Sequence, residues 1–323
     1  MDMALVASRP GGPEVMEWCA LETGTPGPNE ALVRHTAIGV NFIDVYNRTG
    51  LYPWPDSTMI PGAEAAGVVE AIGEGVEGLK VGDRVAYVLK FGAYRERRVL
   101  AADRLVVLPD GVSDDLAASV MLKGLTAQYL VTSSYAVKAG DTVLVHAAAG
   151  GVGLILGQWL KALGARAIGT AGSDEKVALA LKHGYSDVIN YREENFAEKV
   201  MDLTGRQGCE VVYDSVGKDT WRGSIACLKP FGMFANFGQS SGMIDDFKLS
   251  DLASGSKAAC RPVLFDYVAK RADLEMRAAD LFDRLVSGAV KADVVASMPL
   301  KDAAEAHKAL EGRKTTGATI LKP

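Results

Sequence analysis

The sequence is poor in cysteine and histidine, and neither residue type occurs at a spacing that holds a metal ion. The 4 cysteines, Cys19, Cys209, Cys227 and Cys260, are scattered along the 323-residue chain. They form no Cys-x-x-Cys pair, which argues against a structural zinc site or a redox dithiol and suits a reducing compartment. The 4 histidines form no H-x-x-x-H or H-E-x-x-H pattern. We therefore expect no metal.

Long apolar runs and an excess of basic charge are also lacking. The most apolar stretch, 143–157, is shorter than the roughly 18 to 20 residues of a membrane span and contains a histidine. The first residues lack the basic start and apolar core of a signal peptide. The 35 Lys and Arg against 40 Asp and Glu give a net charge of −5, opposite in sign to most nucleic-acid binders. We expect a cytoplasmic protein with no membrane or nucleic-acid partner.

The chain changes character near residue 124. A hydrophobic fraction of 48% and a charged fraction of 23% are ordinary for a globular protein, and the length predicts about two domains. Before residue 124, short β-type runs alternate with turn signals and predict an irregular, mostly β domain. The strand candidates there are 31–40, 67–72, 84–88 and 105–108.

Beyond residue 140, short apolar strands alternate with helices of about ten residues, which predicts βαβ units and a parallel sheet covered on both faces. The strands are expected at 142–146, 165–170, 187–191, 210–214 and 233–237, and the helices at 154–163, 174–182, 194–203 and 219–228. His146 is expected to be a hydrogen-bonded core residue and His183 to cap a helix. Helices at 273–287 and 301–310 follow, and a last strand at 318–321 is expected to return to the first domain.

The strongest local signal is the glycine-rich segment 147–153, AAAGGVG, which follows a strand and opens a helix. Glycines at such a turn let backbone N–H groups approach a pyrophosphate, and the helix N-terminus adds partial positive charge. The spacing is not G-x-G-x-x-G, so the βαβ context carries the interpretation. The alternative is a packing turn without a ligand.

The end of the second βαβ strand indicates which dinucleotide binds. NAD sites carry an acid there, whereas this chain has the small residues GTAGS over 169–173. Lys176 and Tyr191 can supply charge and a hydroxyl to a 2′-phosphate. Asp174 and Glu175 are the counter-evidence, unless they only stabilise the first turn of a helix. The pattern favours NADP over NAD.

A second motif, GQSSG over 238–242, matches the G-x-S-x-G nucleophile elbow of hydrolases. No helical pattern follows it, and only His307 lies downstream as a base. We disfavour a hydrolase for that reason.

Seven motifs, in order along nearly the whole chain, resemble the zeta-crystallin-like quinone oxidoreductase branch of the medium-chain dehydrogenase/reductase superfamily. They are GVNFID (39–44), LYP (51–53), GAEAAGVV (62–69), KGLTA (123–127), AAAGGVG (147–153), VINY (188–191) and YDSVG (213–217). The resemblance implies an α/β protein with a GroES-like, mostly β catalytic domain over 1–123 and 288–323. It also implies a Rossmann doubly wound parallel-sheet domain over 124–287, a homodimer, NADPH as cofactor and quinones as acceptors. Asn41 and Ala63 stand where zinc enzymes of the superfamily carry Cys and His.

The resemblance further implies a set of cofactor-binding residues. Phe42, Ile43, Asp44, Tyr46, Thr126 and Tyr129 would line the nicotinamide end, and Gly151 and Val152 would meet the pyrophosphate. Gly172, Ser173, Lys176, Tyr191 and Arg313 would hold the 2′-phosphate, and Ser215, Val216, Phe237 and Gly238 would border the cofactor.

Three polar residues, Asn41, Tyr46 and Tyr52, are the candidate catalytic residues, because their side chains can donate hydrogen bonds to developing negative charge on an acceptor oxygen. The competing interpretation is that Asn41 only fixes a turn and the tyrosines only pack. The expected reaction is metal-free transfer of a hydride, or of electrons, from NADPH to a quinone. One alternative is reduction of α,β-unsaturated carbonyls such as enals, enones or enoyl thioesters. The other is a low-turnover NADPH-binding structural or regulatory protein.

Overall fold

The computed structural model describes residues 1–55, 57–312 and 315–323. The chain forms two compact units. The first comprises Met1–Leu125, Phe265–Val286 and Ala292–Pro323, and the second comprises Thr126–Leu264 and Ser287–Lys291. The boundary at residue 125 falls inside one long helix, α2 (Asp114–Tyr129). None of the helices in the described part of the chain is long and apolar enough to cross a bilayer.

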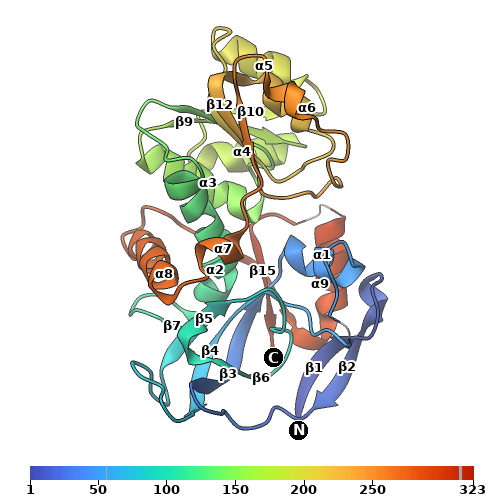
Figure 1. Ribbon diagram of the computed structural model, residues 1–323, viewed down its shortest axis with the longest axis vertical. Coiled ribbons are helices and arrows are strands. Elements are labelled where there is room, and N and C mark those ends of the chain that lie inside the picture. Colours follow the sequence, from blue (N-terminus) through green and yellow to red (C-terminus); the bar gives the residue numbers. More distant parts are fainter. Residues whose placement is uncertain (56, 313–314) are drawn as a thin grey trace. The chain divides into compact units, whose positions relative to one another are not determined.

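The first unit is built on a twisted, mostly antiparallel sheet (Figure 1). Among the described residues its strands run in the order β14-β15-β3-β4-β5-β7, with β6 also paired to β3 and β1 paired to β2 alone. The strands are β1 (Asp2–Ala7), β2 (Met16–Leu21), β3 (Glu30–Gly39), β4 (Glu64–Ile72), β5 (Arg84–Val88), β6 (Arg97–Ala101), β7 (Val106–Val107), β14 (Val294–Pro299) and β15 (Ala318–Lys322). The helical elements are η1 (Pro13–Val15), α1 (Phe42–Thr49), η2 (Ala102–Arg104), α8 (Arg271–Val286), η5 (Leu300–Asp302) and α9 (Ala303–Glu311).

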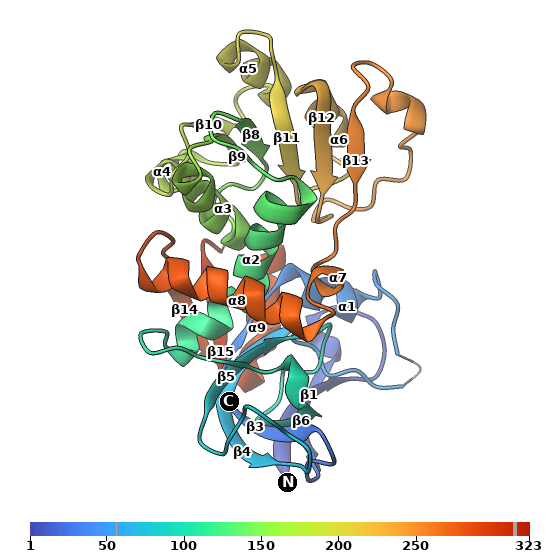
Figure 2. The ribbon, with the colours of Figure 1, turned by 60° about the vertical axis from the view of Figure 1, so that its left-hand side comes forward.

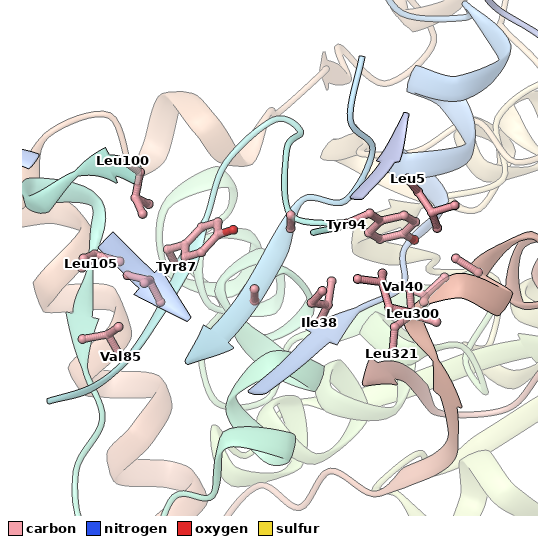
Figure 3. Close-up of a cluster of buried hydrophobic side chains, with 14 of the residues drawn as sticks. Leu5, Ile38, Val40, Val85, Tyr87, Tyr94, Leu100, Leu105, Leu300 and Leu321 are labelled. Atoms are coloured by element: carbon pink, nitrogen blue, oxygen red, sulfur yellow. The ribbon is translucent and has the colours of Figure 1, made fainter. Parts of the chain in front are cut away.

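The core of this unit lies where apolar side chains from alternate strand positions meet α9 and η5 (Figure 3). It contains Leu5, Ile38, Tyr87 and Leu321, all at most 2% exposed. Burial on this scale removes apolar surface from water, which is the main stabilising contribution to such a sheet. Leu321 belongs to β15, which pairs with β3, so the chain end completes this sheet as the sequence predicts.

The second unit carries a parallel sheet in the order β10-β9-β8-β11-β12-β13 within the described residues (Figure 2). Its elements are η3 (Leu130–Ser134), β8 (Thr142–Val145), α3 (Gly151–Ala162), β9 (Arg166–Ala171), α4 (Asp174–Lys182), β10 (Asp187–Asn190), α5 (Phe196–Leu203), β11 (Cys209–Asp214), α6 (Trp221–Ala226), β12 (Leu228–Asn236), η4 (Leu249–Leu252), β13 (Ala258–Cys260) and α7 (Leu264–Tyr267), whose last three residues fall in the first unit. In βαβ order this is the 3-2-1-4-5-6 arrangement of a Rossmann fold, with the order reversing between β8 and β11.

The predicted α/β class and the parallel sheet are confirmed, and several bounds differ for local reasons. Strand 84–88 and helix 174–182 match, whereas the helix expected at 154–163 begins at Gly151, because the glycine turn is already its first turn. The helix expected from 194 begins at Phe196, because the Asn195 side chain caps it through Ala197 N–H at 3.0 Å. Sequence patterns missed the helices α1, α2 and α7 and the strands β1, β2, β6, β13 and β14.

The segment 265–286 lies in a different unit from the one that the sequence predicts. They were expected in the Rossmann domain but belong to the first unit. Leu281 of α8 packs on Gly124, where an added Cβ would lie 2.6 Å from a Leu281 methyl carbon. Arg104 also donates hydrogen bonds to the carbonyls of Val268 and Ala269, at 3.2 and 2.9 Å. These contacts join residues that are far apart in the sequence, so no periodic pattern of residue types predicts them.

Candidate functional site

The glycine-rich turn of the second unit has the geometry of an anion cradle. Ala147 turns the chain out of β8 with a positive φ of 53°, and Gly150 caps α3. Gly151 and Val152 form the first turn of α3, where main-chain N–H groups have no partner within the helix. A Cβ on Gly153 would come within 2.4 Å of the Ala147 carbonyl oxygen, so glycine is required for helix and strand to approach this closely.

At the carboxyl end of β9, four predicted residues make contact in two pairs. A Cβ on Gly172 would lie 2.4 Å from the Tyr191 hydroxyl oxygen, so the phenol lies directly against the glycine. Ser173 caps α4 by accepting the Lys176 N–H at 3.4 Å. Asp174, the possible ribose-binding acid, instead accepts a hydrogen bond from Asn190 at 2.9 Å.

The carboxyl ends of β11 and β12 lie at the same edge of the parallel sheet as the glycine-rich turn after β8 and the end of β9. The Phe237 N–H donates to the Asp214 carbonyl at 2.8 Å, and a Cβ on Gly238 would lie 2.7 Å from the Ser215 carbonyl. The Asp214 carboxylate accepts the N–H groups of Val216 and Gly217 at 2.7 and 2.9 Å. A buried carboxylate therefore fixes the backbone turn that was predicted to border the cofactor.

His146 links three strand ends beneath this edge. Ser224 donates to the Asp214 carboxylate at 2.9 Å, so its oxygen accepts from His146 Nε2 at 2.9 Å. Nδ1 then accepts from the Thr170 hydroxyl at 2.9 Å. Burial lowers the pKa of His146 and keeps the ring neutral. Its predicted role as a hydrogen-bonded core residue is confirmed, as is the cap by His183, which contacts the Leu179 carbonyl at 2.8 Å.

In the first unit, the three candidate catalytic residues lie on and beside α1. Asn41 is the buried N-cap of α1 and forms a reciprocal capping box with Asp44. The rings of Tyr46 and Tyr52 meet edge to face at 5.4 Å, and Phe42 packs beside Tyr46 at 6.0 Å. The three candidate catalytic residues therefore lie within α1, its N-cap and the short segment that follows the helix.

A buried ion pair adjoins Asn41. The Glu64 carboxylate, fully buried at the start of β4, accepts Asn41 Nδ2 at 2.8 Å and Lys123 Nζ at 2.9 Å. Its second oxygen accepts the Leu122 N–H at 2.5 Å. In the sequence, Glu64 and Lys123 stand out only as members of family motifs. Their pairing has no local signal, because the two residues lie 59 positions apart.

A second buried network starts at Asp44. Tyr94 donates its hydroxyl to Asp44 Oδ2 at 3.1 Å and contacts His307 Nε2 at 2.9 Å, while Arg48 reaches His307 Nδ1 at 2.9 Å. Asp44 Oδ1 is buried with no hydrogen-bond partner. Burial, reinforced by the charge of Glu64, raises the pKa of Asp44 to about 7.

The other predicted positions are distributed between the two units. Ile43 is half-buried on α1, whereas Thr126 and Tyr129 are buried in α2 on the second-unit side of the boundary. Arg313 lies outside the described residues. Sequence reasoning missed Arg261, which donates to the carbonyls of Asn236 and Gly238 at 2.8 and 3.3 Å, because it follows β13, a strand without a sequence signal.

The G-x-S-x-G segment is not an elbow. The Ser240 N–H donates to the Ser215 carbonyl at 3.1 Å, and a loop rather than a helix follows. Both ring nitrogens of His307 are already engaged in the first unit. Within residues 1–55, 57–312 and 315–323, no three His, Cys, Asp or Glu side chains are grouped so that they could hold a metal ion.

Together, a Rossmann sheet with a glycine-rich switch-point turn and a separate β unit define a two-unit dehydrogenase or reductase. Family models agree: residues 27–139 match the alcohol dehydrogenase GroES-like domain, and residues 151–280 match the zinc-binding dehydrogenase domain. The quinone oxidoreductase of Pseudomonas aeruginosa is 48% identical over 97% of both chains. The 2-haloacrylate reductase of a Burkholderia species is 43% identical over 100% of this chain and 99% of its own.

A solved structure of Escherichia coli quinone oxidoreductase complexed with NADPH superposes with a TM-score of 0.97. It is 44% identical, and the match covers 99% of this chain and 100% of that one. The chain belongs to the quinone oxidoreductase family of the medium-chain dehydrogenase/reductase superfamily.

Proposed function

We propose that the protein is an NADPH-dependent quinone reductase, with the first unit as the GroES-like catalytic domain and the second as the dinucleotide-binding domain. The observation that carries the proposal is the contact between Gly172 and the Tyr191 hydroxyl. At the position where NAD sites carry an acid that reads a ribose hydroxyl, this contact places the Tyr191 hydroxyl against Gly172, which precedes Ser173, the N-cap of α4. The family relatives and the NADPH complex of one of them support the same cofactor.

The second unit offers fitting partners for each part of NADPH. The N–H groups of Gly151 and Val152 would hold the pyrophosphate at the N-terminus of α3. Ser173, Lys176 and Tyr191 would hold the 2′-phosphate. Ser215, Val216, Phe237 and Gly238 would border the cofactor, and Thr126 and Tyr129 would lie toward the nicotinamide.

The first unit would hold and polarise the acceptor. When bound, NADPH supplies the hydride. Phe42, Tyr46 and Tyr52 form an aromatic cluster, and aromatic rings are suited to pack against a planar quinone. Asn41, Tyr46 and Tyr52 can donate hydrogen bonds to the acceptor oxygen as negative charge develops there, which lowers the barrier to transfer.

Steady-state oxidation of NADPH, followed at the nicotinamide absorbance, tests this proposal. The panel would contain 1,4-benzoquinone, a naphthoquinone, an α,β-unsaturated ketone and 2-chloroacrylate, each with NADPH and with NADH. We expect the highest kcat/KM with NADPH and a quinone. A higher kcat/KM with the ketone or the haloacrylate would replace the quinone with an activated carbon–carbon double bond.

That second substrate class is favoured by one specific finding, the 43% identity to a 2-haloacrylate reductase over the full chain. The third candidate, a structural or regulatory NADPH-binding protein, predicts NADPH binding by calorimetry with no oxidation across the panel.

We further propose a cytoplasmic homodimer. Among the described residues β13 pairs with β12 alone, which leaves its outer edge open, and Ala258 and Ala259 on it are small and exposed. An open edge can pair with the same edge of a second copy. Light scattering after gel filtration would give twice the 34.2 kDa chain mass, and Ala259→Pro would shift it toward the monomer by removing a ladder donor.

A further inference from the structure

We propose that Glu64 is a positioning residue that orients the Asn41 side chain toward the acceptor, with Lys123 as its buried counter-charge. This inference rests on the proposed quinone reductase activity. It concerns residues to which neither the family resemblance nor the relatives' names assign a role.

A hydrogen bond from Asn41 to Glu64 fixes which way the asparagine amide faces. An asparagine amide has two N–H donors and one carbonyl, and which way it faces depends on its partners. Glu64 Oε1 accepts one N–H of Asn41 Nδ2 at 2.8 Å, and a carboxylate cannot act as a donor. This contact fixes the nitrogen side of the amide toward β4 and leaves the second N–H available to another acceptor.

Glu64 is itself held in place by an ion pair and hydrogen bonds. Its carboxylate is fully buried, and a buried charge is tolerated only where it is paired and hydrogen-bonded. Lys123, itself 7% exposed, supplies the ammonium at 2.9 Å and also donates to the Val40 carbonyl at 3.3 Å. The Leu122 N–H occupies the other oxygen. One carboxylate therefore ties the start of β4, the N-cap of α1 and the middle of α2 together.

The charge balance around Glu64 also involves Asp44. Asp44 lies in the first turn of α1, three residues after Asn41, and its contacts are neutral donors: the Asn41 N–H at 2.8 Å and the Tyr94 hydroxyl at 3.1 Å. The groups facing it are Glu64 from β4, Lys123 from α2 and Tyr94 from the loop after β5. Lys123 contacts Glu64 directly, so its ammonium is placed against the carboxylate that accepts from the Asn41 amide.

The inference predicts that Glu64 acts only through Asn41, which a double-mutant cycle measures. In Glu64→Gln one oxygen becomes an NH2 group, so Asn41 and Leu122 cannot both be held. We expect kcat with NADPH and benzoquinone to fall by about tenfold to a hundredfold, as for a small misplacement of a reacting group, with KM for NADPH unchanged. Asn41→Ala should fall similarly, and the double variant should fall no further than Asn41→Ala.

Glu64→Gln leaves the Lys123 ammonium without a counter-charge and can fail to fold. The neutral pair Glu64→Met with Lys123→Met removes both charges together and leaves no acceptor for Asn41, and we expect the same loss of kcat. The matched control is Glu70→Gln, the same change on the same strand, at an ion pair with Arg34 and Arg97. Its kcat should equal that of the wild type.

A readout independent of turnover uses protein labelled with 15N-asparagine and without cofactor. The side-chain amide signal of Asn41, assigned by its loss in Asn41→Ala, should show slow hydrogen exchange in the wild type and fast exchange in both Glu64 variants. Additive losses in the cycle, or an unchanged Asn41 amide, would overturn the inference. An inactive wild type with a protected amide would instead overturn the proposed function.

Discussion

Nε2 of His307 lies 2.9 Å from the Tyr94 hydroxyl, and Nδ1 of the same ring lies 2.9 Å from Arg48 Nη1. A guanidinium can only donate, so Nδ1 is the acceptor and Nε2 carries the hydrogen. Tyr94 can therefore accept from His307 and donate to Asp44. The relationship joins α9 to α1 through a neutral, fully buried imidazole.

This arrangement predicts acid sensitivity. Burial, together with the charge of Arg48, lowers the pKa of His307 to about 3, whereas an unfolded histidine titrates near 6.5. The unfolded chain therefore binds the extra proton between these values, and stability is lost as pH falls from about 6.5 toward 3. His307→Gln keeps an acceptor and a donor without titrating. Urea unfolding at pH 7 and pH 5 should show the wild type losing about 2 kcal/mol more than the variant; equal losses would contradict the prediction.

Asp44 should act with the opposite sign. Its folded-state pKa of about 7 exceeds the unfolded value of 3.8, so the folded protein binds the proton more tightly between these limits. Stability is therefore lost as pH rises from about 4 through 7, and it levels off about one pH unit above 7. Asp44→Asn retains an oxygen for the Asn41 N–H and removes the charge. Relative to the variant, the wild type should lose on the order of 3 kcal/mol between pH 4 and pH 7. A constant difference in the free energy of unfolding would show that Asp44 does not titrate there.

The preference for NADPH should depend on Lys176. If its ammonium contacts the 2′-phosphate, Lys176→Ala removes a charge-assisted hydrogen bond worth about 1.5 to 3 kcal/mol. We expect KM for NADPH to rise by at least about tenfold while KM for NADH stays the same. Lys182→Ala, at the exposed far end of the same helix, is the control and should change neither constant. A parallel rise in both KM values for Lys176→Ala would place its effect elsewhere.

Gly153 should tolerate no side chain. Its Cβ would lie 2.4 Å from the Ala147 carbonyl and 2.6 Å from that of Ala148, both of them main-chain atoms. Gly153→Ala should lower stability by about 1 to 3 kcal/mol and weaken NADPH binding, because α3 must move away from the turn. In Gly27→Ala the nearest atom is the end of the Glu30 side chain at 3.2 Å, which can move. Calorimetric unfolding and titration of the two variants test the contrast, and equal effects would contradict it.

The second unit could be predicted well because its determinants are local. A strand, a glycine turn and an amphipathic helix each fit within about twenty residues, and Ser173, Gly153 and Tyr191 can be placed from neighbours close in sequence. The candidate acceptor side could be predicted only in part. The sequence indicates Asn41, Tyr46 and Tyr52 as hydrogen-bond donors. No local pattern indicates that Asn41 faces Glu64 or that Tyr46 and Tyr52 meet edge to face.

The sequence by itself determined the alternation of strands and helices, the glycine cradle and the absence of an acid at the end of β9, since each depends on residue types at short spacing. Only the tertiary structure decided that α8 belongs with the first unit, that Lys123 neutralises Glu64, and that His307 completes a network begun by Asp44. Those outcomes depend on which buried polar groups form hydrogen bonds and ion pairs with partners far away in the sequence. Any carboxylate can accept from any donor, so chemical type alone does not choose the partner.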